Sequence, residues 1–289
     1  MPDVRQSLLA GMRVGARYAL AAANRAPLGA EGEHLAHRAG ASLEFMDHRE
    51  YQLGDDLRRI NWAAYARSDK LTVKLFREEV SPHCDIVIDA SRSMALPDSA
   101  KPNATVALAA LFAVAADNAG FAHNVHLAGA GCRPVGGGRT SPESWDGIDF
   151  EYAGTPDESF DRVGPGWPAR GIRVLLSDLL WVADPLACLT RFGQDASAVV
   201  VVQVLAAADA EPPAHGNVRL VDSETDATME IFLDATARQR YVSALAGHQE
   251  NWRRAAVQTG AVLTTVIAEN LLDDWRLDDL LAADVLKVL

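Results

Sequence analysis

Short apolar runs alternate with helical segments over residues 85–267, and this alternation constrains the fold more than any other feature of the sequence. The clearest unit is the apolar run 85–89 followed by a helix at 103–118 that is apolar on most faces. Further strand candidates are 124–130, 173–177, 198–205 and 261–267, and further helix candidates are 185–192 and 236–259. This order predicts an α/β fold with a mainly parallel sheet covered by helices on both faces.

Segments at the two ends and one interruption complete the organisation. Residues 7–23 form an amphipathic helix candidate, and residues 41–80 show short apolar alternations typical of a small β-rich lobe. A polar turn between two strand-like runs predicts a β-hairpin insert near 216–234, and the tail 273–289 suits a last helix on the sheet edge. We therefore expect an N-terminal region, residues 1–80, with the helix and the lobe, and an α/β domain over residues 81–289.

Composition excludes several classes of protein. A net charge of −12 over 289 residues disfavours non-specific binding to nucleic acid or anionic membranes, because both need a positive field. The three cysteines, Cys84, Cys132 and Cys188, form no CxxC pair, so neither a zinc site nor a disulfide framework is indicated. The apolar stretches are too short to span a bilayer as helices. We expect a cytoplasmic protein without a membrane anchor.

Polar side chains follow the first buried run of the sheet. Asp89, Ser91 and Ser93 come at alternate positions, and Asp178 follows the run 173–177, so both carboxylates would lie at the same edge of a parallel sheet. Carboxylate and hydroxyl oxygens suit Mg²⁺, or otherwise Mn²⁺ or Ca²⁺. The plainer interpretation is a loop in which Asp and Ser cap the next helix. Two carboxylates at neighbouring strand ends favour the cation site.

This pattern resembles the metal-ion-dependent adhesion site (MIDAS) of von Willebrand factor A domains, which have a Rossmann-like fold. Their site reads Asp-x-Ser-x-Ser, then a Thr in a later loop, then an Asp after another strand. The resemblance implies the metal ligands Asp89, Ser91, Ser93 and Asp178, with Thr155 as the distant Thr and Thr140 as a weaker candidate. The family usually has Thr-Asp-Gly at the last motif, whereas Ser-Asp-Leu stands at 177–179 here, so the loop there departs from the pattern.

A narrower resemblance covers nearly the whole chain. It is carried by Glu44-Phe45, Arg49-Glu50-Tyr51, Gly54-Asp55-Asp56-Leu57-Arg58-Arg59-Ile60-Asn61-Trp62, Ala66-Arg67 and Lys74-Leu75-Phe76. These motifs are similar to the family known as domain of unknown function 58. The resemblance implies a bacterial, non-enzymatic and metal-dependent protein-binding or adaptor module that works beside a MoxR-type AAA+ ATPase. A partner's Asp or Glu would complete the coordination of the metal.

The segment 54–77 is basic and aromatic within an acidic chain. Nucleic-acid binding is one interpretation of this pattern. The favoured one is a structural turn in which Asp55 and Asp56 pair with the arginines while Trp62 anchors the lobe. A protein-docking surface is an intermediate option.

Two other functions compete with the binding module. Carboxylate-held Mg²⁺ at strand ends also occurs in phosphoryl-transfer hydrolases. Against this, a haloacid-dehalogenase-type phosphatase would need Asp in place of Ser91, and a serine hydrolase would need Gly-x-Ser-x-Gly. The third possibility is a structural scaffold whose metal site is unused.

Overall fold

The chain divides into two compact units. A computed structural model describes residues 4–21, 43–52, 55, 57, 60–68, 70–78, 83–136, 140–162, 167–212, 215–223 and 227–289. The first unit comprises residues Met1–Gly29 and Pro82–Leu289, and the second comprises Ala30–Ser81. The N-terminal region expected over residues 1–80 is therefore split. Its first helix belongs to the larger unit because it packs against a helix of the sheet domain.

A six-stranded sheet forms the centre of the larger unit and confirms the α/β expectation. Its strands are β4 (His83–Asp89), β5 (Ala122–Ala128), β6 (Cys132–Pro134), β7 (Ile172–Ser177), β8 (Ala198–Leu205) and β11 (Val262–Ile267). Their order is β11-β8-β7-β4-β5-β6, with every neighbouring pair parallel except β5 with β6. All residues of β4 and β7 are buried, which explains why they read as continuous apolar runs.

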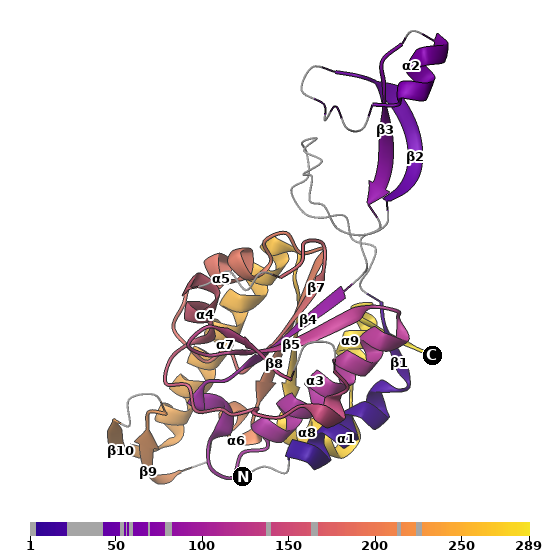
Figure 1. The fold of residues 1–289 in the computed structure, drawn as a ribbon. Helices are drawn as coiled ribbons and strands as arrows, with labels where there is room; N and C mark the ends of the chain where they lie inside the picture. The colour runs from indigo at the N-terminus through magenta and orange to yellow at the C-terminus, as the bar shows by residue number, and fades with distance from the viewer. Residues whose placement is uncertain are drawn as a thin grey trace. The chain divides into compact units, whose positions relative to one another are not determined.

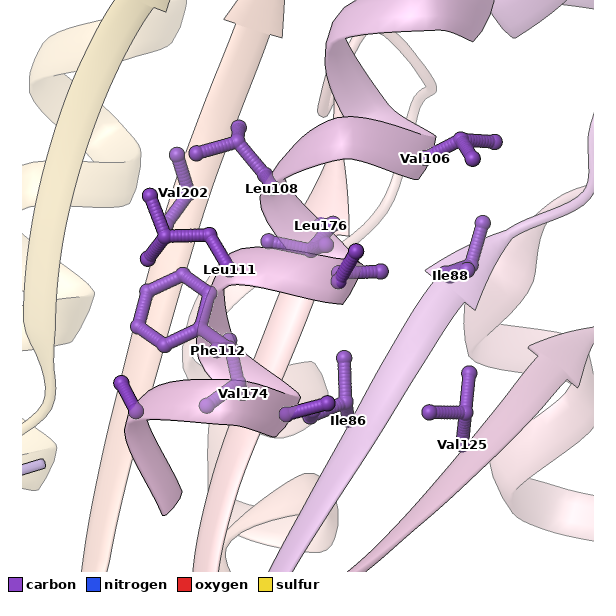
Figure 2. Close-up of a cluster of buried hydrophobic side chains, with 14 of the residues drawn as sticks. Ile86, Ile88, Val106, Leu108, Leu111, Phe112, Val125, Val174, Leu176 and Val202 are labelled. Atoms are coloured by element: carbon purple, nitrogen blue, oxygen red, sulfur yellow. The ribbon is translucent and has the colours of Figure 1, made fainter. Parts of the chain in front are cut away.

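One face of the sheet is covered by α3 (Lys101–Asn118) and α8 (Ala268–Asp274) (Figure 1). The same core includes α1 (Val4–Gly15), which packs on α3, and α9 (Asp278–Ala282). Helix α3 is buried over most of its length because apolar side chains surround its axis. Figure 2 shows Leu108, Leu111 and Phe112 of this helix packed against Ile86, Val174 and other side chains of the strands. Since side chains alternate along a strand, Asp85, Val87 and Asp89 of β4 point to the opposite face.

The opposite face is covered by α4 (Pro156–Arg162), α5 (Pro185–Phe192) and α7 (Ala235–Thr259) (Figure 1). Aromatic side chains form much of this second core, including Phe160, Phe192, Trp181 and Trp252. Asp184 caps the start of α5 with its carboxylate, as Asp234 does for α7. Both predicted helices are confirmed to within one residue at each end.

Two other elements of the larger unit involve short strand pairs. After α6 (Ala207–Ala210), β9 (Gly216–Val221) pairs antiparallel with β10 (Thr228–Leu233), which confirms the hairpin.

The two ends of the larger unit differ from expectation. Helix α1 stops at Gly15, and β1 (Tyr18–Leu20) then pairs with β12 (Leu286–Val288), so the tail ends in a strand after two short helices.

The smaller unit contains an antiparallel pair, β2 (Leu43–Glu50) with β3 (Thr72–Glu78), and the helix α2 (Trp62–Ser68). Ile60 and Val73 are buried and bridge to one another. Trp62 does not anchor the unit as expected, because 62% of its surface is exposed. Asp55 pairs at 2.6 Å with Arg49, which precedes the segment 54–77 whose arginines were the expected partners. Asp56, Arg58 and Arg59 lie outside the described residues.

Candidate functional site

The predicted polar residues lie at the carboxyl ends of the two central strands. Asp89 is the last residue of β4, and Asp178 follows the last residue of its parallel neighbour β7. Both carboxylates are fully buried. The hydroxyl of Ser177, between the two strand ends, donates a hydrogen bond of 2.6 Å to Asp89 Oδ2. The structure therefore brings Asp89 and Asp178 together, as the strand order predicts.

Ser91 and Ser93 lie in the loop that follows Asp89. Their hydroxyl oxygens are 3.0 Å apart, and the Ser91 amide donates to Asp89 Oδ1 at 2.8 Å. Ser91 precedes the short 3₁₀ helix η2 (Arg92–Ala95), yet its side chain makes no capping hydrogen bond to that helix. The helix-cap interpretation therefore does not explain the Ser91 hydroxyl, which is directed at Ser93 instead.

Hydrogen bonds engage both carboxylate oxygens and the backbone carbonyl of Asp178. Its carboxylate oxygen Oδ1 accepts from the Leu180 amide at 3.0 Å, and Oδ2 accepts from Lys101 Nζ at 3.0 Å. Gln203 donates to the Asp178 carbonyl at 2.9 Å. Leu179, where the family pattern has Gly, adopts a left-handed conformation with φ of 57°. The tight turn of the loop is thus kept without the glycine.

Lys101 and Asp209 belong to the site but were not predicted from the sequence. The Lys101 side chain is 0% exposed, and its Nζ lies 3.0 Å from carboxylate oxygens of both Asp178 and Asp209. Burial lowers the pKa of Lys101, but the charges of Asp178 and Asp209 outweigh it and raise the pKa overall. The available signal was a lysine at the start of a mostly apolar helix, since a buried ammonium needs paired carboxylates.

Asp89 is short of compensating charge. Burial, and then the negative charge of Asp178, raise its pKa to about 7, although hydrogen bonds from Ser177 and Ser91 oppose the shift. The cluster contains the carboxylates of Asp89, Asp178 and Asp209 but a single ammonium, that of Lys101. Full ionisation of the cluster therefore leaves it with two uncompensated negative charges.

The structure separates the two candidate threonines. Tyr152 pairs with the Asp89–Ser93 loop through its backbone, because its amide donates to Ala90 and its carbonyl accepts from Arg92. Thr155 lies three residues farther along, at the start of α4. The carbonyl of Thr140 contacts His123 near the start of β5, which is the opposite end of the strands from Asp89. Five strand residues span roughly 16 Å, so Thr140 lies too far from Asp89 to share a metal ion with it.

The potential metal ligands at the strand ends are all oxygen atoms. Within the described ranges, no three His, Cys, Asp or Glu side chains are placed together to hold a metal ion. The strand-end cluster instead combines carboxylates with the hydroxyls of Ser91 and Ser93. Such ligands fit a hard cation such as Mg²⁺. The uncompensated charge at Asp89 also fits a divalent cation, so the residues present are compatible with the expected metal.

Among the residues that the structure describes, no helix combines the length and apolarity needed to cross a membrane.

Comparisons with known proteins connect the chain to uncharacterised relatives. An uncharacterised protein of Mycobacterium bovis, Mb1516, is 27% identical over 267 residues, which cover 86% of this chain and 80% of the relative. The uncharacterised protein MAV169 of Mycobacterium avium is 32% identical over 112 residues, which cover 38% of this chain and 62% of the relative.

Among solved structures, the conserved hypothetical protein BatB of Bacteroides thetaiotaomicron matches with a TM-score of 0.35 and 10% identity. The match covers 69% of this chain and 97% of BatB. An aerotolerance-related membrane protein of Bacteroides fragilis matches with a TM-score of 0.33, also at 10% identity, over 66% of this chain and 94% of that protein. The model of the family described as "Protein of unknown function DUF58" matches residues 47–251, well over half of the chain. The chain therefore belongs to the DUF58 family.

Proposed function

We propose that the larger unit is a von Willebrand factor A-like domain that acts as a non-enzymatic, divalent-metal-dependent protein-binding module. Asp89, Ser91 and Ser93 would hold the ion, with Asp178 and Thr155 completing the set. The observation that carries the proposal is the convergence of the two serine hydroxyls, 3.0 Å apart, with the buried Asp89 carboxylate beside Asp178.

Charge balance supports a divalent rather than a monovalent cation. Lys101 compensates one of the three carboxylates of the cluster, which leaves two negative charges when all three are ionised. Buried charges without compensation are costly, and one divalent ion would neutralise both. When bound, the ion would supply a positive centre to which a carboxylate of a partner protein could bind. The chain's own role is to hold the oxygen ligands in place.

The proposed partner is a MoxR-type AAA+ ATPase, and the proposed setting is protein maturation or complex assembly in the bacterial cytoplasm. This element of the proposal rests on the resemblance to the DUF58 family, to which the chain belongs.

The hydrogen bonds of the site favour binding over hydrolysis. The Ser177 hydroxyl donates to Asp89 and accepts from the Leu179 amide, so both its roles are structural. The nearby His248 contacts the Leu179 carbonyl through Nε2, rather than a hydroxyl that it could activate. Phosphatase turnover that disappears in Asp89→Ala would contradict the binding proposal and favour a phosphoryl-transfer hydrolase.

Calorimetric titration with Mg²⁺ and Mn²⁺ tests the metal site directly. We expect binding by the wild type and by the control variant Thr140→Ala, whose side chain lies at the other end of the sheet, and no binding by Asp89→Ala. Loss of binding in the control alone, or absence of binding in the wild type, would refute the metal site.

A second titration tests the partner. A purified MoxR-type AAA+ ATPase from the same organism should bind in Mg²⁺ and dissociate in EDTA. Association that persists unchanged in EDTA would favour a scaffold whose metal site is unused.

A further inference from the structure

Two apolar side chains stand exposed in the loop that leaves the metal site. Leu180 is 36% exposed, and the Val182 side chain is fully exposed. They lie two and four residues after Asp178. Leu179, before Leu180, and Trp181, between the two, are buried, so the loop alternates between buried and exposed apolar positions.

Hydrogen bonds and aromatic packing hold the loop in this arrangement. The Leu179 amide donates to Ser177 Oγ at 3.0 Å, and its carbonyl contacts His248 Nε2 at 2.6 Å. The Trp181 ring packs edge-on against Trp252 of α7, with 5.4 Å between ring centroids. The exposure of Leu180 and Val182 therefore follows from well-packed neighbours. A preorganised apolar surface of this kind loses little conformational entropy when a partner covers it.

The apolar loop is continuous with the site. The Leu180 amide donates to Asp178 Oδ1 at 3.0 Å, so Leu180 adjoins one of the proposed metal ligands. A partner segment whose carboxylate reached the ion would place its neighbouring residues beside Leu180. Apolar side chains concentrate in the buried part of protein-binding surfaces, and well-packed contacts there supply much of the affinity.

We propose that Leu180 and Val182 form an apolar rim that selects the partner, and that the partner segment carries an apolar residue directly beside the Asp or Glu that reaches the metal. This inference rests on the proposed function, because the partner's carboxylate positions the segment at the ion and the rim then contacts the residue next to that carboxylate. The occupant is thus an acidic segment with a leucine-like residue next to the acid, rather than a purely acidic chain or a second copy of this protein.

The test uses labelled, blocked peptides with a single Asp flanked on either side by Leu or, in the matched set, by Ser. Fluorescence anisotropy is measured with the full chain in Mg²⁺. Burial of a leucine side chain predicts that the Leu peptides bind about tenfold or more tightly than the Ser peptides. In the double variant Leu180→Ser/Val182→Ser, this ratio should fall to about one.

Two controls separate the rim from the metal site. Calorimetric Mg²⁺ binding should be unchanged in the double variant, and Val257→Ser, at a position 81% exposed on α7, should keep the wild-type preference. A Leu preference that survives in the double variant would overturn the rim.

The remaining outcomes are also decisive. If Mg²⁺ binds but the Leu and Ser peptides bind equally or not at all, the rim inference fails while the metal site stands. If Mg²⁺ does not bind, both fail. Self-association of the wild type that is lost in the double variant would assign the rim to a contact between copies instead and overturn the proposal.

Discussion

Replacing Lys101 tests the charge balance of the site at the scale of a single residue. Lys101→Met should lower the free energy of unfolding by about 3–5 kcal/mol, because Asp178 and Asp209 would lose the ammonium that both contact at 3.0 Å. Urea denaturation followed by circular dichroism measures the change. The exposed Lys287 offers a control, since Lys287→Met should have almost no effect. Equal stability of the two variants would show that the buried ion pairs are not needed.

Asp85 makes a second prediction, for acid stability. Burial raises the pKa of Asp85, but contacts with His126 and His83, at 3.6 and 3.3 Å, outweigh it and lower the pKa to about 2. Because the pKa of this carboxylate is lower in the folded than in the unfolded chain, its ionised form stabilises the folded state at pH values above the ordinary pKa of 3.8. That contribution, about 2 kcal/mol, is lost as the pH falls from about 4 to about 2.

The measurement compares unfolding free energies of the wild type and Asp85→Asn across this range. The difference between them should shrink toward acid pH, whereas the surface variant Asp149→Asn, in an exposed pair with Arg133, should differ little from the wild type throughout. A difference that is constant with pH would contradict the assignment.

The sequence predicted individual site residues where their order along the chain was sufficient. Asp89, Ser91 and Ser93 share one loop, and Asp178 follows a strand that could be recognised by its apolar run. Lys101 and Asp209 could not be placed in the same way. Their meeting depends on where the start of α3 and the short helix α6 lie in space, and no spacing in the sequence encodes this.

At the scale of elements, the contact between α1 and α3 depends on a glycine. A side-chain carbon at Gly11 would collide with the backbone of Ala107, including its carbonyl oxygen. Gly11→Ala should therefore push the helices apart and cost about 1–3 kcal/mol. Gly247→Ala in α7 meets open space, so there the better helix propensity of Ala should stabilise by about 0.5–1 kcal/mol. Thermal unfolding of both variants measures these changes in stability, which should have opposite signs. A stabilising Gly11→Ala would refute the close contact.

The sequence located most strands and helices of the sheet domain well, because buried strands and apolar helices have distinct periodicities. It extended the first helix to residue 23, past the actual end at Gly15. The segment 18–20 is too short to show a strand period, and only its pairing with β12 makes it a strand.

For the whole molecule, the β1–β12 pair joins the two ends of the larger unit. Leu286 of β12 is buried in the core, whereas Val288 in the same strand is exposed. Leu286→Ala should cost about 2–5 kcal/mol because it leaves a cavity. Val288→Ala should change the stability by less than about 0.5 kcal/mol. Equal effects in chemical denaturation would show that the last strand does not contribute to the core.

The sequence by itself determined the α/β class, the strand that ends at Asp89, the strand that ends before Asp178 and the hairpin insert. Each of these depends on local periodicity, or on the rule that parallel strands end at one edge. Only the tertiary structure decided the division into units, the position of Thr140 far from the site and the compensation of Asp178 by Lys101. These depend on packing between segments distant in the chain, and the sequence pattern within each segment is the same whichever partner it meets.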